Sequence, residues 1–107
     1  MRTPFQEHLN GMPDMGQGDG WTERQWDRAE SERVRLTDLI ATNRDGYLDK
    51  KLVEHYVKHP EGGDPCVVSH RGRLYVADGH HRAAAAYLRG ERFIRARIIT
   101  IRHNTKD

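Results

Sequence analysis

The chain has 107 residues, of which 36% are hydrophobic and 32% are charged, which suits one domain with a modest core and a highly ionic surface. Its single cysteine, Cys66, excludes an internal disulfide framework, and no apolar stretch is long enough for a signal peptide or a membrane span, which favours a cytoplasmic protein. The formal net charge of +2 hides an asymmetry, because residues 1–65 carry 9 basic and 13 acidic side chains, whereas residues 71–102 carry eight arginines against Asp78 and Glu91. An arginine-rich half favours an anionic ligand held by forked hydrogen bonds.

The first third of the chain is predicted to contribute little to the core. Residues 1–20 mix turn-forming residues without periodicity, which predicts a flexible N-terminal arm. Residues 21–32 are predicted to form a peripheral helix, because Thr22 and Gln25 have the spacing of a capping box. The domain itself is expected to span residues 33–107.

Strand and helix patterns follow one another through the rest of the chain. Residues 33–40 alternate apolar and polar side chains and predict a short strand, and residues 48–58 place apolar side chains at helical spacing. The remaining predicted elements are two strands, Cys66–His70 and Arg73–Ala77, joined by a tight turn, then a helix, His81–Arg89, closed by Gly90, and a strand over residues 92–101. The sum is a single α/β (α+β) domain with a small mixed sheet and short helices.

The sequence Asp-Gly-His-His-Arg, residues 78–82, joins a predicted strand to an alanine-rich helix. A helix start presents N–H groups without partners and therefore accepts anions, Gly79 lets a ligand approach the backbone, and Arg82 falls where its guanidinium would clamp a phosphate. His80 and His81 are expected to donate to phosphate oxygens or to transfer a proton. This predicts a phosphate or nucleotide site, while an architectural turn with Asp78 as a simple N-cap stays open.

Residues 33–101, above all "DPCVVSHRGRLYVADGHHRAAAAYLRGERFIRARI", resemble the ParB/sulfiredoxin-like superfamily. In that superfamily a G-x-x-R-x-x-A turn opens a helix and binds nucleotide phosphates, and Gly79, Arg82 and Ala85 fit this pattern. The resemblance implies the superfamily's fold and a bound nucleotide such as ATP, ADP or CTP, whose Mg²⁺ Asp78 would help to hold. The chain is short for the superfamily, which favours action together with a protein partner.

The branches of the superfamily differ at this turn. Sulfiredoxins carry a nucleophilic cysteine where this chain has His80, and chromosome-partitioning ParB proteins continue into a helix-turn-helix and a dimerisation region, whereas this chain ends at Asp107. The turn is most similar to that of the free-serine kinases, which would give Asp78, His80 and His81 catalytic roles in phosphotransfer or nucleotide hydrolysis. The glutamate that those kinases carry after the first strand would be replaced by Asn43 or Asp45.

Two other classes of function stay open. In a module without catalytic activity, the arginine-rich face would contact DNA phosphates or an acidic protein partner, and its expected members are Arg89, Arg92, Arg95 and Arg97. Small members of the superfamily are often labelled ParB-like nucleases, which implies metal-dependent cleavage that needs Asp78. His55 and His59 have the spacing of shared metal ligands, but Tyr56 breaks the His-Glu-x-x-His pattern, so they are interpreted as surface residues.

Overall fold

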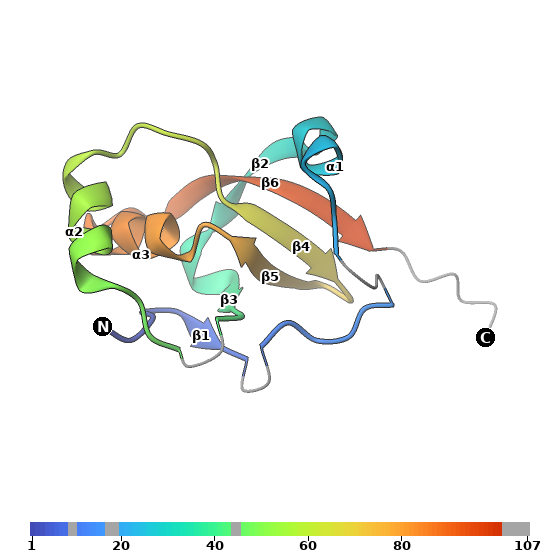
Figure 1. Ribbon diagram of the computed structural model, residues 1–107, viewed down its shortest axis with the longest axis horizontal. Coiled ribbons are helices and arrows are strands. Elements are labelled where there is room, and N and C mark those ends of the chain that lie inside the picture. Colours follow the sequence, from blue (N-terminus) through green and yellow to red (C-terminus); the bar gives the residue numbers. More distant parts are fainter. Residues whose placement is uncertain (9–10, 17–19, 44–45, 102–107) are drawn as a thin grey trace.

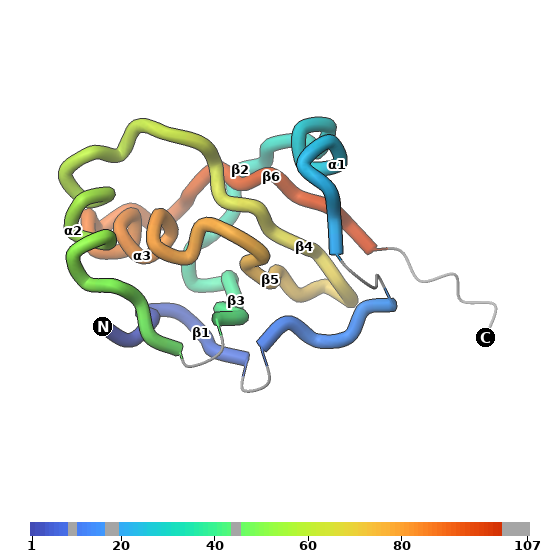
Figure 2. The backbone as a smooth tube through the Cα atoms, in the orientation of Figure 1, coloured from blue at the N-terminus to red at the C-terminus, as the bar shows by residue number. Residues whose placement is uncertain are grey.

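The computed structural model of the protein describes residues 1–8, 11–16, 20–43 and 46–101, and within them a six-stranded mixed sheet (Figures 1 and 2). The strands lie in the order β1-β3-β5-β4-β6-β2. In chain order the elements are β1 (Gln6–Glu7), α1 (Glu23–Arg28), β2 (Glu30–Arg35), a 3₁₀ turn (Leu36–Asp38), β3 (Leu39–Ala41), α2 (Lys50–Lys58), β4 (Cys66–His70), β5 (Arg73–Asp78), α3 (His80–Leu88) and β6 (Phe93–Ile101). The predicted α+β class with a mixed sheet and short helices is confirmed.

Strand β4 lies inside the sheet, antiparallel to β5 and parallel to β6. Val67 is the register partner of both Val76 on β5 and Ile98 on β6, so three apolar side chains meet on one face. The main core lies on this face, between the sheet and helices α2 and α3. Helix α1 contacts β6, near the C-terminal half of that strand in Figure 1.

Helix α3 is enclosed by the fold. Its four consecutive alanines, Ala83 to Ala86, are all 0% exposed, and four consecutive helical residues point around the whole circumference of a helix. Because alanine is small, α3 packs closely on the sheet and on α2. The first turn of α3 is therefore held in a fixed place at the end of β5.

The N-terminal residues are part of the core. Phe5 is 8% exposed, Gln6 pairs in parallel with Ile40 of β3, and the amide of Thr3 donates to the carbonyl of Gly46 at 2.8 Å. This corrects the flexible arm predicted over residues 1–20, of which 9–10 and 17–19 lie outside the described residues. A two-residue strand is too short to show alternation, so local sequence carried no signal for it.

The capping box of α1 is confirmed, because Gln25 N donates to Thr22 Oγ1 at 3.2 Å and Thr22 N donates to Gln25 Oε1 at 2.8 Å. The helix has no buried residue and is peripheral, but it is shorter than predicted. Strand β2 begins at Glu30, so it starts inside the helix predicted over residues 21–32 and before the predicted domain start at residue 33. These residues are extended because the whole of β2 pairs with β6.

The single strand predicted over residues 33–40 is two strands. A 3₁₀ turn separates β2 at one edge of the sheet from β3 near the other. Leu36 and Leu39 are both buried, at 1% and 0% exposure, and this spacing of three fits the turn better than a continuous strand.

The other predicted elements lie close to their predicted bounds. Arg71 and Gly72 have φ angles of 52° and 78°, as a tight hairpin requires, and Asp49 caps α2 by accepting from Lys51 N at 3.0 Å. No helix in the described part of the chain is long and apolar enough to cross a membrane.

Candidate functional site

The turn between β5 and α3 is built around Gly79, which occupies the N-cap position of the helix with φ 95°. No side chain caps α3. Asp78 is exposed, and its Oδ1 accepts from Gly79 N at 2.9 Å instead of capping the helix. The first intrahelical bond runs from Ala83 N to Gly79 O at 3.0 Å, so the amides of the preceding turn point out of the helix start. This gives the partly positive, open helix terminus expected from the sequence.

Gly79 also makes a close approach to the α2–β4 loop. A Cβ atom at this position would lie 2.9 Å from the Cα and the Cβ of Pro65, nearer than real side-chain contacts. Both the positive φ and the contact therefore require glycine here. The loop that ends at Pro65 forms one wall of the site.

His80 is tied to the end of β3. Its Nε2 accepts from Thr42 N at 3.0 Å, and Thr42 Oγ1 in turn donates to the carbonyl of Val76. The pKa of His80 is lowered to about 4, mainly by burial and to a lesser extent by the neighbouring His81, while Asp78 opposes the shift. The ring is therefore neutral near pH 7, and because Nε2 accepts, its proton lies on Nδ1.

His81 links the starts of two helices. Its Nε2 accepts from the amide of Asp49, the N-cap residue of α2, at 3.1 Å. The structure therefore brings both histidines to the turn, as the sequence predicts, but their Nε2 atoms are already engaged by backbone amides. Sequence reasoning gave no indication of Thr42 and Asp49 as their partners.

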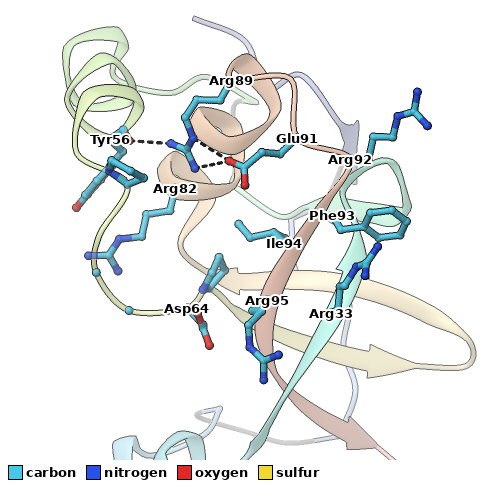
Figure 3. Close-up of a pocket in the computed structure, with 14 residues that line it drawn as sticks. Arg33, Tyr56, Asp64, Arg82, Arg89, Glu91, Arg92, Phe93, Ile94 and Arg95 are labelled. Carbon is cyan, nitrogen blue, oxygen red and sulfur yellow. Dashed lines mark hydrogen bonds and ion pairs between the residues drawn. The ribbon is translucent and has the colours of Figure 1, made fainter.

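Arg82 extends from the first turn of α3 toward the loop that holds Gly62 and Gly63 (Figure 3). Its guanidinium carbon lies 4.9 Å from the centroid of the Tyr56 ring, a cation–π contact that fixes the direction of the side chain. Its Nε is buried and has no hydrogen-bond partner among the described residues. A buried donor without a partner calls for an explanation, and a ligand bound against this guanidinium would provide one.

A cleft of about 460 Å³ adjoins the turn and is lined by all five residues from Asp78 to Arg82. Its opposite wall comes from the segment before α2, from α2 itself and from Asp64. Asn43 lines the cleft and donates through Nδ2 to the carbonyl of Tyr47 at 2.9 Å, while Asp45, its predicted alternative, lies outside the described residues. The described residues contain no group of three metal-ligating side chains, so a cation here would be held mainly by its ligand.

The predicted arginine face is divided in the structure. Arg97 donates to the carbonyls of Trp26 and Asp27, both at 3.1 Å, and so fastens α1 to β6. Arg89 pairs with Glu91 at 2.6 Å and donates to the carbonyl of Tyr56. Both arginines thus make contacts within the protein, and the face of Arg89, Arg92, Arg95 and Arg97 stays a prediction.

A second cavity, of about 510 Å³, contains the remaining members of that face (Figure 3). Five arginines line it: Arg33, Arg82, Arg89, Arg92 and Arg95. Arg33 was not identified from the sequence, because its place beside Arg95 depends on the pairing of β2 with β6. The cavity shares Tyr56, Asp64 and Arg82 with the cleft at the α3 start.

The other candidate groups are not assembled into sites. The rings of His55 and His59 lie 4.8 Å apart on the exposed side of α2, and His59 Nδ1 lies 3.6 Å from Glu61 Oε1. Burial raises the pKa of the Cys66 thiol, and the charge of Asp78 adds to the shift, so the thiol stays protonated near neutral pH. Neither arrangement indicates a metal centre or a nucleophile.

The described residues form a small α+β domain, and the same fold occurs in two solved structures. The structure is similar to that of sulfiredoxin from Arabidopsis thaliana, with a TM-score of 0.61 and 19% identity over 67% of this chain and 86% of that chain. It is also similar to the C-terminally truncated chromosome-partitioning protein ParB from Caulobacter crescentus complexed with CTP-γ-S, with a TM-score of 0.54 and 13% identity over 68% of this chain and 46% of that chain.

The family is given by the sequence. Residues 5–102 match the family model VapB, described as Antitoxin VapB-like, and the chain therefore belongs to this family. No curated protein is significantly similar in sequence. The fold resemblance read from the sequence is thus confirmed, whereas the antitoxin family was not anticipated.

Proposed function

We propose that this member of the Antitoxin VapB-like family binds a phosphate-bearing ligand, a nucleotide in the simplest case, at the start of α3. One observation carries the proposal: the buried Nε of Arg82 has no partner among the described residues, and its side chain lines a cleft at a helix start that no side chain caps. A phosphate in the cleft would accept from this guanidinium and from the first-turn amides together.

The energetics favour an occupied site. Leaving a buried donor unsatisfied costs about 1–3 kcal/mol, and a hydrogen bond to a charged group contributes about 1.5–3 kcal/mol. Three such bonds correspond to a dissociation constant in the range of about 1 mM to 1 µM. The stacking of Arg82 on Tyr56 reduces the entropy lost on binding, since the side chain is already oriented.

The proposal is for binding rather than catalysis. Nε2 of His80 and of His81 already accepts a backbone N–H, so a proton-transfer step through either ring would have to use Nδ1. Asp78 is exposed at the mouth of the cleft, where it would help to hold a Mg²⁺ ion brought in by nucleotide phosphates.

The test is calorimetric titration of ATP, ADP, CTP and GTP with Mg²⁺ into the wild type and Arg82→Ala. CTP is included because the ParB structure of similar fold was determined with CTP-γ-S. Arg73→Ala is the control, because this exposed arginine lies at the opposite end of β5 from the turn. We expect saturable binding of at least one nucleotide that Arg82→Ala weakens tenfold or more. Absence of binding, or equal loss in both variants, would refute the proposal.

A second candidate function follows from the family, since an antitoxin counteracts a toxin and so implies a protein partner. The supporting observation is an apolar hollow of about 590 Å³ at the end of α3, where Tyr87 is 41% exposed and lies beside Leu36 and Phe93. Exposed aromatic side chains of this kind are common at protein interfaces. Co-purification with a partner that Tyr87→Ser abolishes and Arg73→Ala retains would support it.

A further inference from the structure

The cavity lined by five arginines, which we call the arginine cleft, lies between the loop Pro60–Pro65 and residues 91–95 (Figure 3). Its acidic lining residues are Asp64 and Glu91, and Glu91 is neutralised by Arg89. Four arginines, namely Arg33, Arg82, Arg92 and Arg95, therefore face one carboxylate. The described part of the cleft carries a clear excess of positive charge.

Two of these arginines repel each other. Arg33 on β2 and Arg95 on β6 are register partners, so they lie directly opposite each other on the same face of the sheet. Like charges in this position destabilise a strand pair. Figure 3 shows the two guanidinium groups turned apart. Arg33 is stacked 4.0 Å from the Phe93 centroid, and Arg95 donates to the carbonyl of Ser31 at 3.2 Å.

The described residues place no ion-pair partner beside Arg33 or Arg95. No carboxylate in this part of the chain therefore neutralises either charge, and the contacts with Phe93 and Ser31 weaken the repulsion without removing it. An anion bound against both guanidinium groups would remove it, and the planar fork of arginine matches the oxygens of a phosphate.

The arginine cleft and the cleft at the α3 start share part of their lining. Both are lined by Tyr56, Asp64 and Arg82, and each has a volume of about 500 Å³, large enough for a ligand of nucleotide size. A ligand that carries phosphates well beyond the helix start would pass Arg82 and reach the arginine cleft, which Arg33 and Arg95 also line. Phosphates that recur beyond the length of one nucleotide are a property of a nucleic-acid strand, whereas the phosphates of a nucleoside triphosphate are directly linked to one another.

We infer that the ligand is a single strand of nucleic acid, whose backbone passes from the start of α3 into the arginine cleft. This inference rests on the proposed phosphate site, because Arg82 belongs to both clefts. The rings of Phe93 and Tyr56 are covered by arginines, so the strand is held by its backbone and little base preference is expected. Affinity should fall steeply with added salt.

The experiment is fluorescence anisotropy with labelled eight-nucleotide uridine and thymidine strands, competed by UMP, TMP and pyrophosphate. The test variant is the double substitution Arg33→Gln with Arg95→Gln. The control removes two exposed arginines from α1, Arg24→Gln with Arg28→Gln, and so changes the net charge equally. Thermal unfolding of each variant establishes that the fold is retained.

We expect the wild type to bind the eight-nucleotide strands at least about tenfold more tightly than a mononucleotide. The Arg33/Arg95 variant should lose this gain while still binding mononucleotides. The slope of the logarithm of the binding constant against the logarithm of the salt concentration should fall in magnitude by about 1.4, the value for two lost phosphate contacts on a single strand. The control variant should keep most of the gain. Charge-retaining Arg33→Lys with Arg95→Lys should keep the salt slope and lose part of the affinity.

The outcomes separate this inference from the proposed function. Binding of mononucleotides that depends on Arg82, without tighter binding of the longer strands, would overturn the inference and leave the proposed function intact. Absence of binding by every phosphate ligand would overturn both. Displacement of the strands by an oligoglutamate peptide of equal charge, with equal or higher affinity, would also overturn it and point to an acidic protein segment.

Discussion

Replacing Gly79 with alanine tests whether the start of α3 is fixed by its contact with the α2–β4 loop. The residue has φ 95°, a region that costs an L-residue about 1–2 kcal/mol. The new methyl group would also lie 2.9 Å from the Cα of Pro65, where overpacking costs about 1–3 kcal/mol. We therefore expect Gly79→Ala to lower the free energy of unfolding by about 2–5 kcal/mol, a large part of the total stability of a domain of this size.

Gly90 provides a matched control, because its φ of 84° is similar and no atom lies within 4 Å of the Cβ position. Gly90→Ala should cost only the backbone strain, about 1–2 kcal/mol. The difference between the two variants isolates the contact with Pro65 and should be about 1–3 kcal/mol.

Urea unfolding followed by circular dichroism measures both variants against the wild type, and thermal unfolding provides a second reading. At about 4–8 °C per kcal/mol, Gly79→Ala should lower Tm by about 10 °C or more. Equal losses for Gly79→Ala and Gly90→Ala would show that Pro65 does not constrain the turn, and the proposed geometry of the phosphate cleft would then lose one of its walls.

Three further predictions concern other parts of the fold. Phe5→Ala should lower the free energy of unfolding, measured in urea, by about 3–5 kcal/mol, because this side chain lies in the core. Met12→Ala, at an exposed position, should lower it little, and equal effects of the two substitutions would contradict the packing of the N-terminal segment. Arg97→Ala should release α1, with a shift of tryptophan fluorescence and a loss of about 1–2 kcal/mol, while Arg28→Ala on the exposed helix surface should leave the spectrum unchanged. The pKa of His80 is about 4 in the folded protein, against an ordinary value of 6.5. The unfolded chain therefore binds the proton first, and stability should fall as the pH drops from about 6.5 to about 4. His80→Gln should flatten this dependence, as measured by thermal unfolding across that range.

The C-terminal half of the fold could be predicted almost to the residue. Its signals are local: Arg71 and Gly72 form the hairpin turn, β-branched residues make the strands on either side, and Gly90 ends α3. The strands of the N-terminal half could not, because the parallel pairing of β1 with β3 and the antiparallel pairing of β2 with β6 are long-range contacts. Neither two-residue β1 nor the charged edge strand β2 carries a pattern that specifies its partner.

The candidate site shows the same division. The strand–turn–helix start and the place of Arg82 follow from adjacent residues and were predictable. The partners of the two histidines were not, since the amides that donate to His80 and His81 lie 38 and 32 residues earlier in the chain. The place of both imidazoles at the turn follows from the local sequence, whereas their hydrogen-bond roles depend on these distant amides.

The role of His80 determines how ligand binding depends on pH. If imidazolium groups held the phosphate, binding would strengthen in acid, because protonation adds charge and a donor. If neutral His80 positions the turn through its bond to Thr42, protonation breaks that bond and binding weakens toward pH 4. The charged and titratable neighbours are His81, which favours the neutral ring, and Asp78, which opposes it. The His80→Gln variant separates these two cases. The glutamine amide oxygen still accepts from Thr42 but does not titrate, and any titration of the ligand itself affects both proteins equally. Nucleotide affinity in the wild type should therefore fall below that of His80→Gln as the pH is lowered from 6.5 to 4, and the opposite order would assign His80 a direct contact with phosphate.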